Sequence, residues 1–143
     1  MGTTTFTGPV RSGPIFDTSG NTLGNDVANV GYAVLAQSFP LLEDGLTTDT
    51  TIVLPAGATI VSIQVVSTVA WGAALDLNVV DYTGAVAALA GTQTPTLGVQ
   101  AFTPSALAEA ALWIAAPTDL QVQTVSTAAG AGDGVLTVTY IQN

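Results

Sequence analysis

Apolar and polar side chains alternate along several segments of this chain, and this alternation limits the possible folds more than any other feature. A period of two residues is typical of a half-buried β-strand, because successive side chains of a strand point to opposite faces. Segments 75–79, 120–123 and 136–140 show this period, and 59–71 is the longest example. Its apolar face is predicted to carry Val61, Ile63, Val65, Val69 and, as a core residue, Trp71. The alternation therefore predicts a mainly β protein.

Turn-forming residues separate the predicted strands. Turns are expected at 55–58 and 81–84, which contain proline, glycine and aspartate. A first strand is expected at 31–38, followed by a solvated loop at 41–50. The C-terminal strands are predicted to form a hairpin whose loop is the glycine-rich segment 130–134. Short antiparallel strands with turns at this spacing predict an antiparallel β-sandwich or jelly-roll.

Helical signals are few, and we expect at most one or two short helices. The alanine-rich segment 84–90 is compatible with one of them. A second is predicted after Thr103, which would be the N-cap, with Pro104 in the first turn and an end before Pro117. Glu109 is expected on the solvent face of this second helix.

Residues 1–26 are predicted to form an extended N-terminal arm, and residues 27–143 a single β-sandwich domain. Threonine, glycine and proline recur every few residues in the arm, and its apolar side chains are sparse. Such a segment buries too little of itself to offset an ordering cost of about 1–2 kcal/mol per residue. The arm is therefore expected to be either disordered or ordered by lying on another surface, and its spaced apolar residues favour the second alternative. The candidate interface residues of the arm are Phe6, Val10, Arg11, Ile15 and Phe16.

Composition excludes several classes of function. The 143 residues include no cysteine, no histidine and no lysine. Arg11 is the one cationic side chain against ten carboxylates, so the formal net charge is −9. The commonest general base, transition-metal ligand and Schiff-base former are therefore missing. We expect neither an enzyme nor a bound metal or cofactor. One arginine cannot neutralise a row of phosphates, so nucleic acid and anionic membranes are not expected partners.

The remaining polar and aromatic candidates are weak. Glu43 and Asp44 are adjacent in the expected loop, so their carboxylates should diverge rather than face one cleft. Segment 17–21 has the spacing that opens a calcium loop but lacks the glycine and glutamate that complete one. Trp113 is compatible with the core, with a protein interface or with a sugar ring. No unbroken apolar run long enough for a membrane span is present, and the first residues are neither basic nor apolar enough for a signal peptide. We therefore expect synthesis in a cytoplasm, without export.

Four stretches of the sequence, in this order, resemble small virion structural proteins of tailed bacteriophages. They are TTTFTGPVRSG from position 3, NDVANVGYAVLAQS from 25, TTIVLPAGATIVSIQVVSTVAW from 50 and GDGVLTVTYIQ from 132. The resemblance implies a β-rich protein with an extended arm, bound to the capsid exterior as a decoration (cement) protein. It further implies the major capsid protein as a partner and a homo-oligomer, with a trimer favoured.

On this interpretation the arm, from residue 3 to about 25, ties capsid subunits together, and Trp113 joins the candidate interface residues. One alternative is a head-fibre or tail structural protein that contacts the host. Another, from a different class, is a carbohydrate-binding β-sandwich that uses Trp113 and loop carboxylates.

Overall fold

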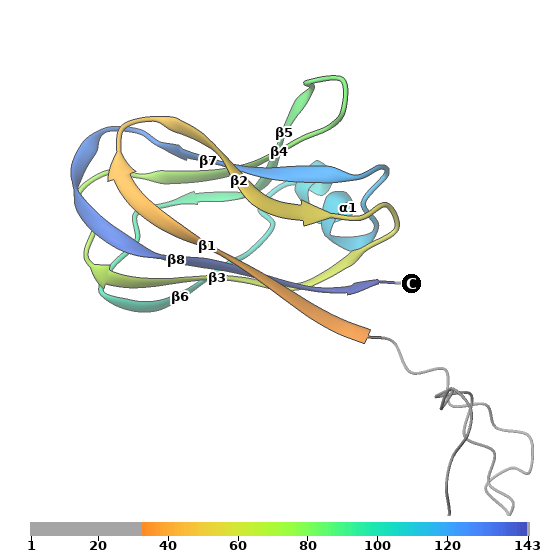
Figure 1. The fold of residues 1–143 in the computed structure, drawn as a ribbon, viewed down its shortest axis with the longest axis horizontal. Helices are drawn as coiled ribbons and strands as arrows, with labels where there is room; N and C mark the ends of the chain where they lie inside the picture. Colours follow the sequence, from red (N-terminus) through yellow and green to blue (C-terminus); the bar gives the residue numbers. More distant parts are fainter. Residues whose placement is uncertain (1–32, 143) are drawn as a thin grey trace, which may run out of the picture. The chain divides into compact units, whose positions relative to one another are not determined.

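The computed structural model describes residues 33–142, which form a sandwich of two sheets (Figure 1). The predicted arm lies outside the described residues. The strands and the helix are β1 Ala33–Asp44, β2 Thr47–Leu54, β3 Thr59–Val69, β4 Leu75–Val80, β5 Val86–Gln93, β6 Gly98–Phe102, α1 Leu107–Ile114, β7 Leu120–Ser126 and β8 Ala129–Gln142. The mainly β prediction, with one short helix in the described residues, is confirmed.

The strand order is that of a jelly-roll. One sheet has the order β1-β8-β3-β6 and the other β2-β7-β4-β5, with every pairing antiparallel. Each connection crosses from one sheet to the other except β4 to β5. Two four-stranded sheets wound in this way define the eight-stranded jelly-roll. The predicted β-sandwich or jelly-roll is therefore confirmed.

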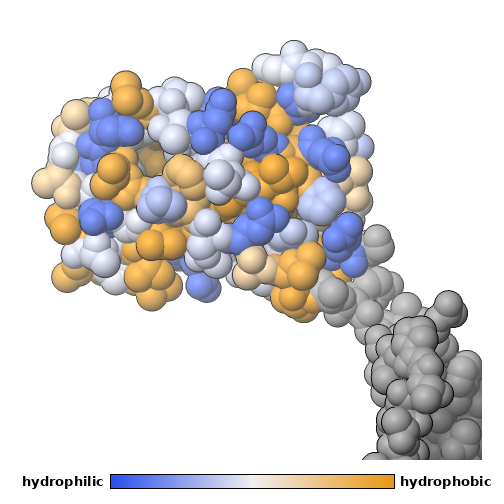
Figure 2. All heavy atoms as spheres, in the orientation of Figure 1, coloured by the Kyte–Doolittle hydropathy of each residue, from blue (hydrophilic) through white to orange (hydrophobic). Residues whose placement is uncertain are grey.

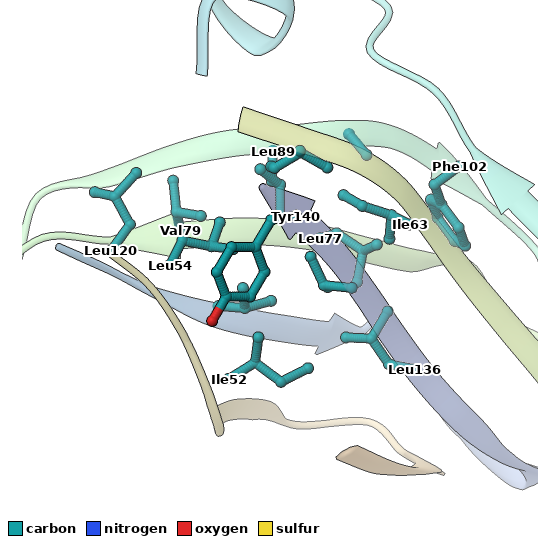
Figure 3. Close-up of a cluster of buried hydrophobic side chains, with 14 of the residues drawn as sticks. Ile52, Leu54, Ile63, Leu77, Val79, Leu89, Phe102, Leu120, Leu136 and Tyr140 are labelled. Carbon is teal, nitrogen blue, oxygen red and sulfur yellow. The ribbon is translucent and has the colours of Figure 1, made fainter. Parts of the chain in front are cut away.

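The core lies between the two sheets and consists of the inward side chains of both (Figure 3). The inward residues of β4 and β7 alternate with half-exposed ones, as the two-residue period predicts. Trp71 is buried, as expected. The largest fully buried side chains are Phe102, Ile52, Leu54, Ile63, Leu75, Leu77, Leu89 and Leu136.

Two residues predicted for the buried face of β3 are exposed instead. Val61 and Val69 point outward, although Ile63 and Val65 between them are fully buried. The pairing of β3 with β8 shifts register between Ile60 and Ser62 and again between Ser67 and Val69. A bulge adds one residue to a strand, so the alternation changes face there.

The prediction of a solvated loop at 41–50 is wrong. β1 continues to Asp44, and β2 begins at Thr47, so the connection is a tight turn at Gly45. Gly45 has φ +72°, and a Cβ there would lie 2.8 Å from the Ala129 nitrogen. Glycine is the residue that tolerates both constraints. The acidic residues that suggested a loop are in fact at the end of a strand.

The possible helix at 84–90 is also wrong, because this segment forms most of β5. Alanine favours helices, but β5 pairs with β4 and buries Leu89 and Ala90 against the core. Tertiary pairing overrides local propensity here.

The second predicted helix is confirmed as α1, although its start differs. Its N-cap is Ala106, not Thr103, and Glu109 is buried rather than on a solvent face. The Glu109 carboxylate accepts hydrogen bonds from the Ser105 backbone N–H and hydroxyl, both at 2.7 Å, and from the Ala106 N–H at 3.1 Å. These bonds satisfy backbone donors at the helix start, which is the role of the glutamate in a capping box.

The predicted C-terminal hairpin is wrong, because β7 and β8 belong to different sheets. The glycine-rich segment 130–134 is part of β8, the second strand of its sheet. A Cβ at Gly132 would lie 2.5 Å from the Trp71 ring, and one at Gly134 would lie 2.7 Å from the Val66 carbonyl oxygen. The glycines therefore allow close approach of neighbouring groups rather than a loop.

Candidate functional site

The candidate site is an outward sheet face that carries almost no charge. We call it the valine–threonine face, and define it by the outward residues of the β1-β8-β3-β6 sheet: Val34, Ala36, Ser38, Pro40, Ser62, Gln64, Val66, Val99, Ala101, Val135, Thr137, Thr139 and Ile141. Two rows of paired residues cross all four strands. One row is Pro40, Val135, Val66 and Val99, and the other is Ser38, Thr137, Gln64 and Ala101.

The centre of this face is partly exposed and carries no charge. Val66 and Val135 are each 40% exposed. The hydroxyl groups of Ser38 and Thr137 are hydrogen-bonded to each other at 2.9 Å, so they lose less on leaving water than unpaired hydroxyls would. Carboxylates occur only where β1 ends, at Asp44 and at Asp133 opposite Leu42. The rest of the face is free of ionisable groups.

The outward face of the other sheet differs in its polar groups. Asp49, Gln123 and Asn78 form one row across β2, β7 and β4. The Gln123 side-chain amide donates to the Asp49 carboxylate at 2.8 Å, and the Thr92 hydroxyl donates to Asp76. This face therefore carries carboxylates in its middle, where the valine–threonine face has methyl and hydroxyl groups and the Gln64 amide.

One end of the sandwich carries α1 (Figure 1), and exposed apolar side chains lie at this end as well. Leu107 and Ile114 of α1 are 91% and 70% exposed, and Tyr82 in the β4–β5 turn is 86% exposed. A groove of about 250 Å³ lies between α1 and the hairpin formed by β4 and β5, and Leu112 and Val86 are among its lining residues. Figure 2 shows one side of the molecule, where apolar side chains lie among polar ones across the sandwich.

Trp113, the described member of the predicted interface residues, is half-buried and packs against the core. Its indole N–H donates to the Leu89 carbonyl oxygen at 2.6 Å. The indole nitrogen is therefore already paired within the domain. The other five, Phe6, Val10, Arg11, Ile15 and Phe16, lie outside the described residues, as does segment 17–21.

Two buried carboxylates serve as acceptors of backbone hydrogen bonds. Glu43 accepts from the N–H groups of Gly72 and Gly132, each at 2.8 Å, and from that of Ala73. We call this arrangement the Glu43 latch, because it joins the end of β1 to the β3–β4 connection and to β8. The Gly132 hydrogen bond is the main cause that lowers the pKa of Glu43, against the opposing effect of burial.

Glu109 is the second of these acceptors. The Ser105 hydroxyl, followed by the Ser105 N–H, lowers the pKa of Glu109, again against the opposing effect of burial. Both carboxylates are thus engaged with the backbone near them. Asp44, in contrast, is exposed, so the adjacent Glu43 and Asp44 diverge as expected. Among residues 33–142, no three acidic side chains gather in a way that could hold a metal ion.

One further opening lies between the sheets, beside β1 and β2. Its volume is about 210 Å³, and Phe39, Leu42 and Thr48 are among its lining residues. Nearer the start of β1, the Gln37 side-chain amide donates to the Val53 carbonyl oxygen at 2.8 Å and accepts from the Val53 N–H at 3.0 Å. Gln37 thus pairs the outer backbone groups of edge strand β2, which limits strand addition there.

Sequence reasoning singled out the arm and Trp113 but missed the valine–threonine face. The sequence does contain a signal for this face, in the residues that alternate with the apolar core residues of the strands. Ser38, Gln64 and Thr137 are all uncharged, and ionisable residues are absent from the outward positions between them. That these positions share one sheet face follows only from the strand order.

Comparison with known proteins gives a likeness of fold. No protein-family model matches the chain, and no curated protein matches it by sequence. Among solved structures, the capsid of Ralstonia phage GP4 aligns with a TM-score of 0.53 at 19% identity, over 82% of this chain and 89% of that chain. The cyanophage Pam1 capsid asymmetric unit aligns with a TM-score of 0.48 at 18% identity, over 89% of this chain and 97% of that chain.

In the described part of the chain, no helix is long and apolar enough to cross a membrane.

Proposed function

We propose that this chain is a non-enzymatic structural protein of a bacteriophage virion that binds the outer capsid surface as a decoration (cement) protein and stabilises the shell. The observation that carries the proposal is the jelly-roll shared with a chain of the Ralstonia phage GP4 capsid over most of the length of both chains. Jelly-rolls also occur in lectins, so the topology alone does not select this function. The surface and the composition supply the additional support.

The exposed surface supports a role in protein contact. Interface cores are depleted of charged residues, and both the valine–threonine face and the α1 end expose large apolar side chains. The chain has 8% charged residues, against about 25% in an average soluble domain. A surface of this kind suits a subunit held between neighbours.

In this proposal the major capsid protein is the partner, the exterior of the virion is the location, and the chain associates with copies of itself, with a trimer favoured. The arm, residues 3 to about 25, lies across capsid subunits and carries the contacts of Phe6, Val10, Arg11, Ile15 and Phe16. Trp113, being half-buried, would contribute only through its exposed edge.

Addition of the purified chain to capsids from which it has been removed tests the proposal. We expect saturable binding at a fixed number of sites, and a capsid melting temperature that rises with occupancy, because a ligand that binds only the assembled state stabilises it by mass action. A variant lacking residues 2–25 should bind more weakly while its domain keeps the same melting temperature. Full binding by this variant would refute the role of the arm, and absence of binding by the full chain would refute the proposal.

The carbohydrate-binding alternative has a direct test in a glycan array. It requires selective sugar binding that Trp113→Ala removes. Trp113 is half-buried and packs against the core, so only part of its ring is open for stacking on a sugar, and this favours the structural proposal. Electron microscopy of labelled virions distinguishes the proposal from the head-fibre or tail alternative. The proposal predicts label over the capsid lattice, and the alternative predicts label on a fibre or the tail.

A further inference from the structure

We infer that the valine–threonine face binds a second copy of this chain. The inference rests on the proposed function, in which copies of the chain associate, and it assigns the contact to one surface. Three properties of the described residues lead to it: the distribution of charge, the size of the face, and the groups present on the competing surfaces.

The first argument is electrostatic. Residues 33–142 contain eight of the ten carboxylates and neither lysine nor arginine, so in this domain a second copy offers no cation to any carboxylate. Charges are largely screened beyond about 8 Å in physiological salt, but closer ones repel. Two copies can therefore meet closely only where carboxylates are absent from the contact. The valine–threonine face meets this condition over its whole length except at Asp44 and Asp133.

The second argument is size. The strands β1, β8 and β3 have 12, 14 and 11 residues, and β6 has five. At about 3.3 Å per residue and about 4.8 Å between strands, they span a planar area on the order of 600 Å². Stable interfaces begin near 600 Å² per partner. The exposed side chain of Val61, on β3, extends the uncharged area, whereas the exposed Leu42 and Val69 both pair with Asp133. The face therefore has approximately the extent that a specific contact between two copies needs.

The third argument excludes the other large surfaces. The outward face of the β2-β7-β4-β5 sheet would bring Asp49 and Asp76 of one copy toward another copy that has no cation to pair with them. The α1 end carries Asp81 beside its groove, and Asp119 precedes β7. Those surfaces suit a partner with basic groups, whereas the valine–threonine face suits another copy of this acidic chain.

Charge insertion tests the inference in the full chain. Val66→Asp and Val135→Asp each place a carboxylate at the centre of the face, on two different strands. Val53→Asp is the matched control, because Val53 is 43% exposed on the outward side of the other sheet, against 40% for Val66 and Val135. Sedimentation equilibrium gives the dissociation constant of the oligomer, and circular dichroism melts show whether each variant folds.

We expect the wild-type chain to self-associate and each face variant to weaken this association by roughly 100-fold, because a charge buried without a partner at an interface is costly. Val53→Asp should associate as the wild type does. The inference would be overturned by a wild-type chain that stays monomeric at high concentration, by face variants that associate as the wild type does, or by a Val53→Asp variant that dissociates as readily as the face variants. A monomeric wild type that oligomerises only after removal of residues 2–25 would point to the arm of the same chain as the occupant, and would also overturn it.

Self-association is measured without capsids, so this test can fail while the proposed capsid role stands. A wild-type chain that binds capsids as a monomer would refute the inference and the proposed self-association, and would leave the capsid role in place. An oligomer sensitive to Val66→Asp that ignores capsids would refute the proposed capsid role and leave the assigned surface in place.

Discussion

The two outward faces of the sandwich have the same architecture but different chemistry. Each is a four-stranded antiparallel sheet over the same core. One carries rows of valine, threonine and serine, and the other carries Asp49 and Asp76 with their hydrogen-bonding partners. The shared core requires apolar side chains at the inward positions of both sheets, so the two sheets can differ in chemistry mainly at their outward positions. Their difference is therefore the better guide to function.

The sheets differ internally as well. β8 of the first sheet contains Gly130, Gly132 and Gly134, whereas β7, second in the order of the other sheet, has no glycine. The missing side chains leave room for the Glu43 carboxylate and the Trp71 ring. The first sheet therefore contains the Glu43 latch, where the end of β1, the β3–β4 connection and β8 meet. The second sheet has no glycine in β7 to make room for such a contact. Four predictions test this comparison.

The largest effect is expected where β8 has no space for a side chain. Gly132→Val should destabilise the domain by about 3 kcal/mol, because its Cβ would overlap the Trp71 ring and approach Glu43. Ala131→Val, at the exposed neighbouring position of the same strand, should change the free energy of unfolding by less than about 0.5 kcal/mol. Urea unfolding measures both. Equal losses in the two variants would contradict the assigned role of Gly132.

The next effect separates the inner and outer sides of one strand. Val65 is fully buried and Val66 is exposed, although the two are adjacent in β3. Val65→Ala should cost about 2 kcal/mol through lost burial and the cavity that remains. Val66→Ala should stay within about 0.5 kcal/mol. Thermal or urea unfolding of the pair compares them, and a larger loss at Val66 would mean that the face is part of the folding core.

The third prediction concerns acid. Hydrogen bonding lowers the folded-state pKa of Glu43 and of Glu109, from an ordinary value of 4.5 for each. The stability that they contribute is therefore present above about pH 4.5 and is lost as pH falls through their folded-state pKa values. Glu43→Gln should lower the melting temperature at pH 7 and reduce the further loss between pH 5 and pH 3. An unchanged pH dependence in this variant would rule out the Glu43 latch as a source of acid sensitivity.

The smallest effect is expected on the charged face. Asp49→Asn also removes one negative charge, but from an exposed pair with Gln123 rather than from the latch. It should change the free energy of unfolding at pH 7 by less than about 0.5 kcal/mol. A loss as large as that of Glu43→Gln would show that net charge, rather than the latch, determines the stability of the domain.

Local patterns in the sequence predicted much of the fold. The two-residue alternation was enough to predict β4, β7 and β8. The prolines at 104 and 117 were enough to predict a helix between them, where α1 lies. Errors arose where distant contacts override that pattern. Bulges opposite β8 reverse Val61, β5 forms a strand despite its alanines, and the 130–134 glycines accommodate Glu43 and Trp71.

The sequence alone determined that the protein is mainly β, that its core lies at alternating positions, and that the chain lacks histidine, cysteine and lysine for chemistry. These are properties of composition and of short segments. Only the tertiary structure decided that β7 and β8 belong to different sheets, that Glu43 is buried, and that uncharged residues from four strands share one face. Strand order depends on contacts between residues far apart in the chain, and a two-residue period carries no information about which strands become neighbours.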